Sequence, residues 1–240
     1  MTTNTLVIPK EDLFPLLLSI KQRDLRVYAG LLYWLACRAG ELLPYQHYKT
    51  TYKRDKDGVL VRDEKGFCEI ESRQEIYSSP GIPISTIEVK EKMILFSVIP
   101  VFKSKKKGET KIGIVPKKNN PLFADITTYI NERKELQDKR NKEAENSGSP
   151  PPTVFLFETD LFNDTPELFF WRFKKRLDRV LAKKHFSPHS LRKTRLTHIG
   201  QKTGNVFYVK ALSGHASIEM ASEYVASKNL LDDMKKYGEV

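Results

Sequence analysis

Five side chains in three short patches of the chain are of types that can bind and attack a phosphate. They are two arginines, two histidines and a tyrosine, namely Arg38, Arg192, His189, His215 and Tyr224. A guanidinium holds anionic oxygens with permanently charged donors, and an imidazole donates to them or moves a proton. A tyrosine hydroxyl becomes a nucleophile when nearby cations help it to lose its proton. If the fold gathers these groups, they can hold a phosphodiester and attack its phosphorus.

The residues around them resemble the catalytic domain of the tyrosine recombinases, the integrases of phages, plasmids and archaeal elements. Cys37-Arg38-Ala39-Gly40-Glu41-Leu42 is similar to the patch that holds the family's first arginine. His189-Ser190-Leu191-Arg192 matches the family's H-x-L-R box. Ser213-Gly214-His215, followed by Tyr224, matches the box that precedes the nucleophile. These features follow the family's order and extend the resemblance from about residue 8 to about residue 227.

The resemblance implies a role for each of the five side chains. Arg38 and Arg192 would grip the non-bridging oxygens of the scissile phosphate, where charge accumulates in the transition state. His215 would donate to the same phosphate, and His189 would position it or accept the tyrosine proton. Tyr224 would attack and form a 3′-phosphotyrosyl bond, so that the strand can be resealed without ATP, metal or another cofactor.

A general acid must protonate the departing 5′ oxygen, and in the family it is a lysine on a β-hairpin turn. The lysine run from 103 to 107, between two β-branched and aromatic segments, occupies that place. Lys105 is preferred because Ser104-Lys105 resembles the family's Ser/Thr-Lys, and Lys107 is its rival. Contacts to DNA are expected from Lys103, Lys106, Lys107 and Lys193.

The composition agrees with a globular protein that binds a polyanion. Lys and Arg number 41 against 30 Asp and Glu, for a net charge of +11, and 40% of the residues are hydrophobic. Neutralising phosphates releases their counterions, so such an excess favours double-stranded DNA. The two cysteines form neither a CxxC pair nor a metal-ligand cluster, and no secretory signal or membrane-length apolar run is visible. We therefore predict an intracellular, cytoplasmic protein of a virus or mobile element that acts without a membrane.

The periodicity predicts an α+β fold, mainly helical, with a small antiparallel β-sheet and an enlarged β-rich insertion. Leu25, Tyr28, Leu31, Leu32 and Leu35 mark the buried face of a helix that ends near Gly40. We expect strands within 93–102 and 112–115, a helix over 121–139, a flexible loop over 141–152, and helices from Pro166 onward. Ser187 and Pro188 favour a helix start just before His189. No internal repeat is evident, and 1–240 forms one catalytic domain.

The chain differs from the family in two places. The first motif lies so near Met1 that the N-terminal core-binding domain is predicted absent, in either an excised catalytic domain or a natural minimal recombinase. The insertion over 45–92 mixes lysines and arginines with tyrosines, and can contact DNA, contact a neighbouring protomer, or form a surface hairpin. The tail from Leu230 to Val240 can pack on a neighbouring subunit or on its own domain.

We therefore predict a site-specific recombinase or integrase that works as a homo-tetramer on DNA, with a monomer in isolation left open. Two alternatives remain. A type IB topoisomerase-like nicking-closing enzyme would use the same residues, and a non-catalytic DNA-binding regulator would keep only the fold. Taken singly, Arg38 with Glu41 could be a plain ion pair, and Tyr224 one core tyrosine among ten.

Overall fold

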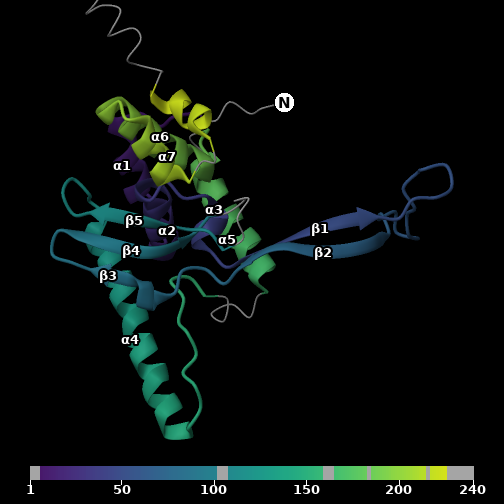
Figure 1. Ribbon diagram of the computed structural model, residues 1–240, viewed down its shortest axis with the longest axis horizontal. Coiled ribbons are helices and arrows are strands. Elements are labelled where there is room, and N and C mark those ends of the chain that lie inside the picture. Colours follow the sequence, from purple (N-terminus) through teal and green to yellow (C-terminus); the bar gives the residue numbers. More distant parts are fainter. Residues whose placement is uncertain (1–5, 102–107, 159–164, 183–184, 215–216, 226–240) are drawn as a thin grey trace, which may run out of the picture.

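The computed structural model describes residues 6–101, 108–158, 165–182, 185–214 and 217–225, which form a mainly helical body with a three-stranded sheet on one side (Figure 1). Residues 218–225 are also helical. The helices are α1 (Lys10–Leu18), α2 (Arg23–Trp34), α3 (Ala39–Leu42), α4 (Phe123–Ser147), α5 (Pro166–Ala182), α6 (Pro188–Thr203), α7 (Val206–Ser213) and the short 3-10 turn η1 (Ile84–Thr86). The strands are β1 (Tyr45–Tyr52), β2 (Ile70–Ser79), β3 (Ile87–Val89), β4 (Met93–Pro100) and β5 (Thr110–Pro116).

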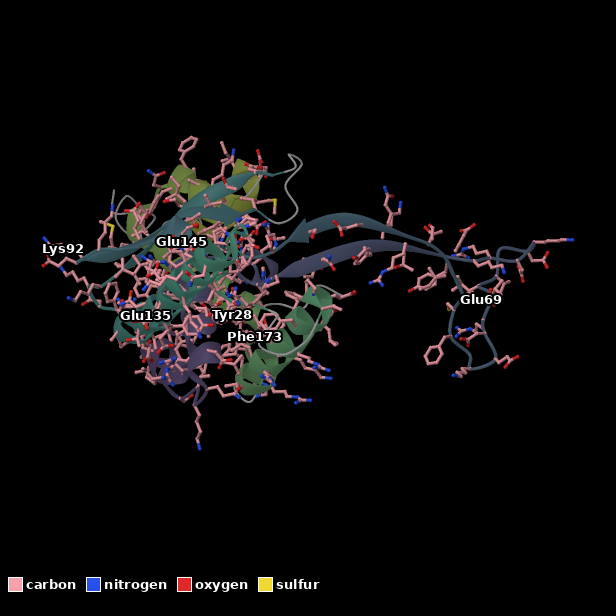
Figure 2. All side chains as sticks on the ribbon, turned by 90° about the horizontal axis from the view of Figure 1, so that it is seen from below. Tyr28, Glu69, Lys92, Glu135, Glu145 and Phe173 are labelled. Atoms are coloured by element: carbon pink, nitrogen blue, oxygen red, sulfur yellow. The ribbon has the colours of Figure 1, made fainter. Side chains whose placement is uncertain are left out.

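Helix α2 runs through the middle of the body and is apolar around most of its circumference, as expected for a fully buried helix. It contacts α1, α4, α5 and α6. The ring of Tyr28 meets Phe157 and Phe173 edge-on, with centroids 5.6 and 5.2 Å apart, and Figure 2 shows Tyr28 and Phe173 in this core. Helices α2 and α5 thus pack in one apolar core, to which α6 contributes Leu191.

Strands β3, β4 and β5 form an antiparallel sheet in that order. In the β4–β5 hairpin Met93 pairs with Pro116 and Pro100 with Thr110. The predicted fold class is confirmed by this small sheet and the helical body. The hairpin tip, with the candidate lysines Lys103, Lys105, Lys106 and Lys107, lies outside the described residues.

Strands β1 and β2 form a separate ribbon that projects away from the body (Figure 1). They pair antiparallel from Tyr45 opposite Ser79 to Tyr52 opposite Ile70. The predicted insertion over 45–92 includes this ribbon and also η1 and β3, and β3 is an edge strand of the main sheet. The part that stands apart from the body is 45–79, called the ribbon below.

The tip of the ribbon contains an eight-residue repeat, contrary to the expectation that no repeat is present. Arg54-Asp55-x-x-Gly58 and Arg62-Asp63-x-x-Gly66 have the same hydrogen bonds. In each copy the aspartate Oδ1 accepts two backbone N–H groups, and the arginine donates to the glycine carbonyl. The glycines have φ of 80° and 81°, in the left-handed region that these turns require.

Two predicted helix boundaries are wrong. Helix α2 ends at Trp34 rather than near Gly40, because the chain reverses at Ala36, whose φ is 47°. Helix α4 continues to Ser147, so the first half of the loop predicted over 141–152 is helical. The left-handed Gly148 that follows is the actual C-terminal signal. In the part of the chain that the structure covers, no helix combines the length and apolar character needed to cross a bilayer.

Candidate active site

Arg38 is the N-cap residue of α3 and is held by Glu41, three residues later. The carboxylate of Glu41 is fully buried. Its Oε1 accepts from Nη1 of Arg38 at 3.1 Å, and its Oε2 accepts from the Arg38 backbone N–H at 3.0 Å. Glu41 thus fixes both the backbone and the side chain of Arg38. The left-handed conformation of Ala36 ends α2 and reverses the chain. Helix α3 can therefore start at Ala39, with Arg38 turned toward α6.

Arg192 ties α6 to two other segments of the body. Helix α6 starts at Pro188, as predicted, with Ser187 and Ser190 forming a reciprocal capping pair. The Arg192 side chain is 1% exposed, and its Nη1 and Nη2 donate to the carbonyls of Ala36 at 2.5 Å and Ser213 at 2.8 Å. These bonds fix the guanidinium between the end of α2 and the end of α7, two residues before His215.

Tyr224 lies on the helical residues 218–225, which pack against α6 and α7 in a small second core. The close contact depends on Gly200, because a Cβ at that position would lie 2.3 Å from the carbonyl oxygen of Tyr224. No side chain fits there without moving the tyrosine backbone. Gly200 was not predicted, because a lone glycine within a helix has no pattern that signals a contact with a distant segment.

The electrostatics show that these side chains act on one another. Burial raises the pKa of Tyr224, and Glu223 adds to this, whereas the charges of Arg192 and Arg38 oppose it. Burial lowers the pKa of His189, and Arg192, Arg38 and Lys193 lower it further. His189 is therefore neutral near pH 7 and can accept a proton, while the arginines favour the tyrosinate.

A cavity of about 420 Å³ adjoins this cluster between α3, β1, α5 and α6. Arg38 and His189 line it together with Tyr45, Phe170 and Lys174. The two predicted site residues therefore face open space rather than packed protein, as a site for a large substrate requires.

A buried lysine that the sequence interpretation missed belongs to the same cluster. Lys111 of β5 has a side chain only 6% exposed, and its Nζ lies 3.2 Å from Oε2 of Glu41. It also donates to the carbonyl of Leu212 at 3.1 Å. A single lysine in an alternating strand usually lies on the solvated face, so its position gave no signal.

The structure brings together four of the predicted site residues, Arg38, His189, Arg192 and Tyr224. Lys193 follows in α6, and Gly214 ends α7 in a left-handed conformation. His215 and the lysines Lys103, Lys105, Lys106 and Lys107 lie outside the described residues. Within the described ranges no group of three or more His, Cys, Asp or Glu side chains could hold a metal ion.

Comparisons with known proteins identify the family. The model of the phage integrase family matches residues 81–230. A tyrosine recombinase of Thermosipho africanus (strain TCF52B) is 33% identical over 87 residues, which cover 35% of this chain and 31% of the relative.

Solved structures share the fold at low identity. A XerA recombinase matches with a TM-score of 0.56 and 14% identity, over 98% of this chain and 65% of that one. XerH recombinase, in a post-cleavage complex with its difH substrate, matches with a TM-score of 0.54 and 15% identity, over 99% of this chain and 54% of that one. The Tn1549 transposon integrase with circular intermediate DNA has a TM-score of 0.54 and 14% identity, over 98% of this chain and 68% of that one. The chain thus spans a third to two thirds of the length of these relatives.

Proposed function

Because the chain belongs to the phage integrase family, we propose that it is a site-specific recombinase that cleaves and rejoins duplex DNA through a 3′-phosphotyrosyl bond. The observation that carries the proposal is the shared electrostatic environment of Arg38, Arg192 and Tyr224. Two guanidiniums beside a half-buried phenol match the needs of attack on a phosphodiester. Burial raises the pKa of this phenol, and the two arginines oppose that rise.

In the proposed cleavage step, the phenolic oxygen of Tyr224 attacks the scissile phosphorus. A new O–P bond forms, and the P–O5′ bond breaks. Neutral His189 accepts the phenolic proton, while Arg38 and Arg192 bind the non-bridging oxygens as their charge grows. The covalent phosphotyrosine keeps the energy of the broken ester, so a 5′ hydroxyl can attack it and reseal a strand without ATP.

His215 and a lysine complete the proposed site. His215 follows α7 directly after Gly214, and Arg192 already holds the carbonyl of Ser213. We assign His215 the role of third hydrogen-bond donor to the phosphate, beside Arg38 and Arg192. Lys105, with Lys107 as rival, protonates the departing 5′ oxygen from the β4–β5 hairpin. Lys103, Lys106 and Lys193 contact the DNA backbone.

Duplex DNA as the partner is supported by the net charge of +11 and by the DNA-bound XerH and Tn1549 structures. We propose a homo-tetramer as the active assembly on DNA, because exchange between two duplexes requires four cleavages. The setting that fits this activity is the inside of a host cell, on the DNA of a virus or mobile element.

The test is a nicked suicide substrate that carries the attachment site. After cleavage the short strand diffuses away, so the covalent adduct accumulates and is measured on a denaturing gel. The wild-type protein should form it at low salt, where phosphate contacts are strongest. Tyr224→Phe should form none, whereas Tyr208→Phe, an exposed tyrosine on α7, should form it normally. An undiminished adduct from Tyr224→Phe would refute the assignment.

The same protein distinguishes the two alternatives. Relaxation of supercoiled plasmid that lacks an attachment site, without exchange between sites, would identify a type IB topoisomerase-like enzyme. Tight duplex binding with no adduct from the wild type would identify a non-catalytic regulator.

A further inference from the structure

Lys111 occupies an unusual position for a lysine, because its charged end is buried. The ammonium lies between the carboxylate of Glu41 in α3 and the carbonyl of Leu212 near the end of α7. A lysine is rarely buried to this extent unless its charge is paired. A single side chain of β5 therefore connects the arginine-bearing turn with the segment that leads to His215.

The carboxylate of Glu41 lies among three cations that compete for it. Arg38 is hydrogen-bonded at 3.1 Å and Lys111 lies at 3.2 Å, but Arg192 stands at 3.8 Å, beyond a hydrogen bond. Oε2, the oxygen that faces Arg192, receives Lys111 and the backbone N–H of Arg38. Lys111 thus occupies the lone pair that Arg192 would otherwise take.

This occupation matters because a guanidinium and a carboxylate form a paired, two-bond contact when nothing prevents it. An Arg192 held in that way by Glu41 would present fewer N–H groups to a phosphate. Its charge would also be neutralised by a closer carboxylate. Lys111 satisfies the carboxylate and keeps Arg192 in its bonds to the carbonyls of Ala36 and Ser213.

The stem of Lys111 also lies close to the turn that follows α7. A Cβ placed on Gly214 would lie 3.8 Å from Cδ of Lys111 and 3.2 Å from Cγ1 of Val101. Its ammonium binds a carbonyl in the last turn of α7, where a cation is favourable. Since β5 leads out of the hairpin tip, the same side chain fixes that hairpin against the residues just before His215.

We propose that Lys111 is a positioning residue that keeps Glu41 from capturing Arg192 and holds the β4–β5 hairpin against the turn before His215. This proposal rests on the function proposed above. Lys111 itself does not touch the substrate. It acts through Arg192, which remains oriented toward the scissile phosphate.

Arg133 provides a matched control for a merely structural effect. It is similarly buried, it lies 3.9 Å from the carboxylate of Glu158, and it donates to the backbone carbonyl of Leu156. It has the same two kinds of partner as Lys111, but in α4, outside the cluster. Arg133→Met and Lys111→Met should both lower the melting temperature, whereas only Lys111→Met should slow cleavage.

The first measurement is single-turnover cleavage of the suicide substrate at saturating DNA. Lys111→Met should bind DNA within about threefold of wild type but cleave about 100-fold more slowly, the scale expected when a catalytic group is displaced. Lys111→Arg should recover most of the rate. A substrate with a neutral methylphosphonate at the scissile position needs the guanidinium charges less, so the deficit should shrink on it.

The second measurement needs no activity. A crystal structure of Lys111→Met should show Nη1 of Arg192 within hydrogen-bond distance of Oε2 of Glu41. Unmoved Arg192 or unchanged cleavage would overturn the proposal, as would equal losses on both substrates. If Lys111→Met does not fold, the same substitution in a Glu41→Gln background removes the carboxylate that would bind Arg192. Relative to Glu41→Gln alone, this double variant should lose much less rate than about 100-fold, because only the contact with Leu212 is then lost. Absence of any adduct from the wild type would refute the proposed function, while the crystal structure would still decide the arrangement.

Discussion

The cluster around Arg192 and the tip of the ribbon use the same residue types in opposite ways. Arg192 donates to carbonyls 156 and 21 residues away in the sequence. Arg54 and Arg62 donate to carbonyls only four residues away. The first kind of bond holds distant segments together, and the second kind only closes a local turn. The number of arginines therefore does not indicate function in this chain. The sequence separation between an arginine and its hydrogen-bond partners does.

The two regions also differ in charge. The ribbon carries seven cationic and seven anionic side chains and is neutral, although the whole chain has a net charge of +11. The cationic residues are Lys49, Lys53, Arg54, Lys56, Arg62, Lys65 and Arg73, and the anionic ones are Asp55, Asp57, Asp63, Glu64, Glu69, Glu71 and Glu75. The excess positive charge therefore belongs to the rest of the chain, where a phosphate backbone would be attracted.

The largest contrast is expected between Arg192→Ala and Arg54→Ala. Losing Arg192 leaves the buried carbonyls of Ala36 and Ser213 without its donors and takes a nearby cation from the buried Glu41, which should destabilise the protein by about 3–5 kcal/mol. Cleavage should fall by about a thousandfold or more, since a donor to the transition state is lost. Arg54→Ala should cost less than about 1 kcal/mol, as for an exposed hydrogen bond. Denaturant unfolding and adduct formation measure both, and equal effects would erase the distinction.

A smaller contrast is expected between two glycines. Gly200→Ala places a Cβ against the backbone of Tyr224, and displacing the nucleophile by about 1 Å should slow cleavage about 100-fold. Gly58→Ala meets nothing within 4 Å and has only its φ of 80° to strain, at about 1–2 kcal/mol. Its cleavage rate should be unchanged. Normal cleavage by Gly200→Ala would mean that Tyr224 is not the nucleophile.

The third contrast concerns acid stability. Burial raises the pKa of Glu41, but Lys111, Arg192 and Arg38 outweigh it, so the pKa lies below 4.5. A lowered pKa stabilises the fold above the unfolded value, and this stability is lost as the pH falls through the folded value. Glu41→Gln should therefore be less stable at pH 7 but lose less stability between pH 5 and 3. Glu69→Gln, which breaks an exposed ion pair with Lys53, should cost under about 1 kcal/mol at pH 7. If Glu41→Gln and the wild type lose the same free energy of unfolding between pH 5 and 3, the buried network around Glu41 is contradicted.

Sequence reasoning predicted which candidate side chains come together better than it predicted the scaffold that holds them. Arg38, His189, Arg192 and Tyr224 could be predicted because phosphate chemistry restricts residue types and the motifs occur in order. Lys111 could not be predicted, because Leu212, whose carbonyl it binds, is 101 residues away. Gly200 could not be predicted either, because it contacts Tyr224 on a separate helical segment. Neither residue type has a spacing pattern that signals such a contact. Pair contacts of this kind exist only after folding.

The fold errors have local and tertiary causes. Alanine favours helix, so propensity continues α2 through Ala36, but Arg192 holds the Ala36 carbonyl in a reversed turn. Asn146-Ser147-Gly148 suggested a loop, although only Gly148 needs a non-helical conformation. The ribbon repeat was visible as Arg-Asp-x-x-Gly, but two copies are too few to stand out without their turns.

The smallest effect is expected from removing the ribbon tip. Replacing residues 53–69 by Asn-Gly would join the paired Tyr52 and Ile70 through a tight hairpin turn. The deleted segment has five cations and five anions, so neither net charge nor salt dependence of DNA binding should change. Glu69 stands at the far end of the ribbon, away from the core (Figure 2), so the melting temperature and single-turnover cleavage should also hold. If instead DNA binding or strand exchange fails while cleavage of a short suicide substrate persists, the tip contacts distant DNA or a neighbouring protomer, and its local turns serve assembly rather than chemistry.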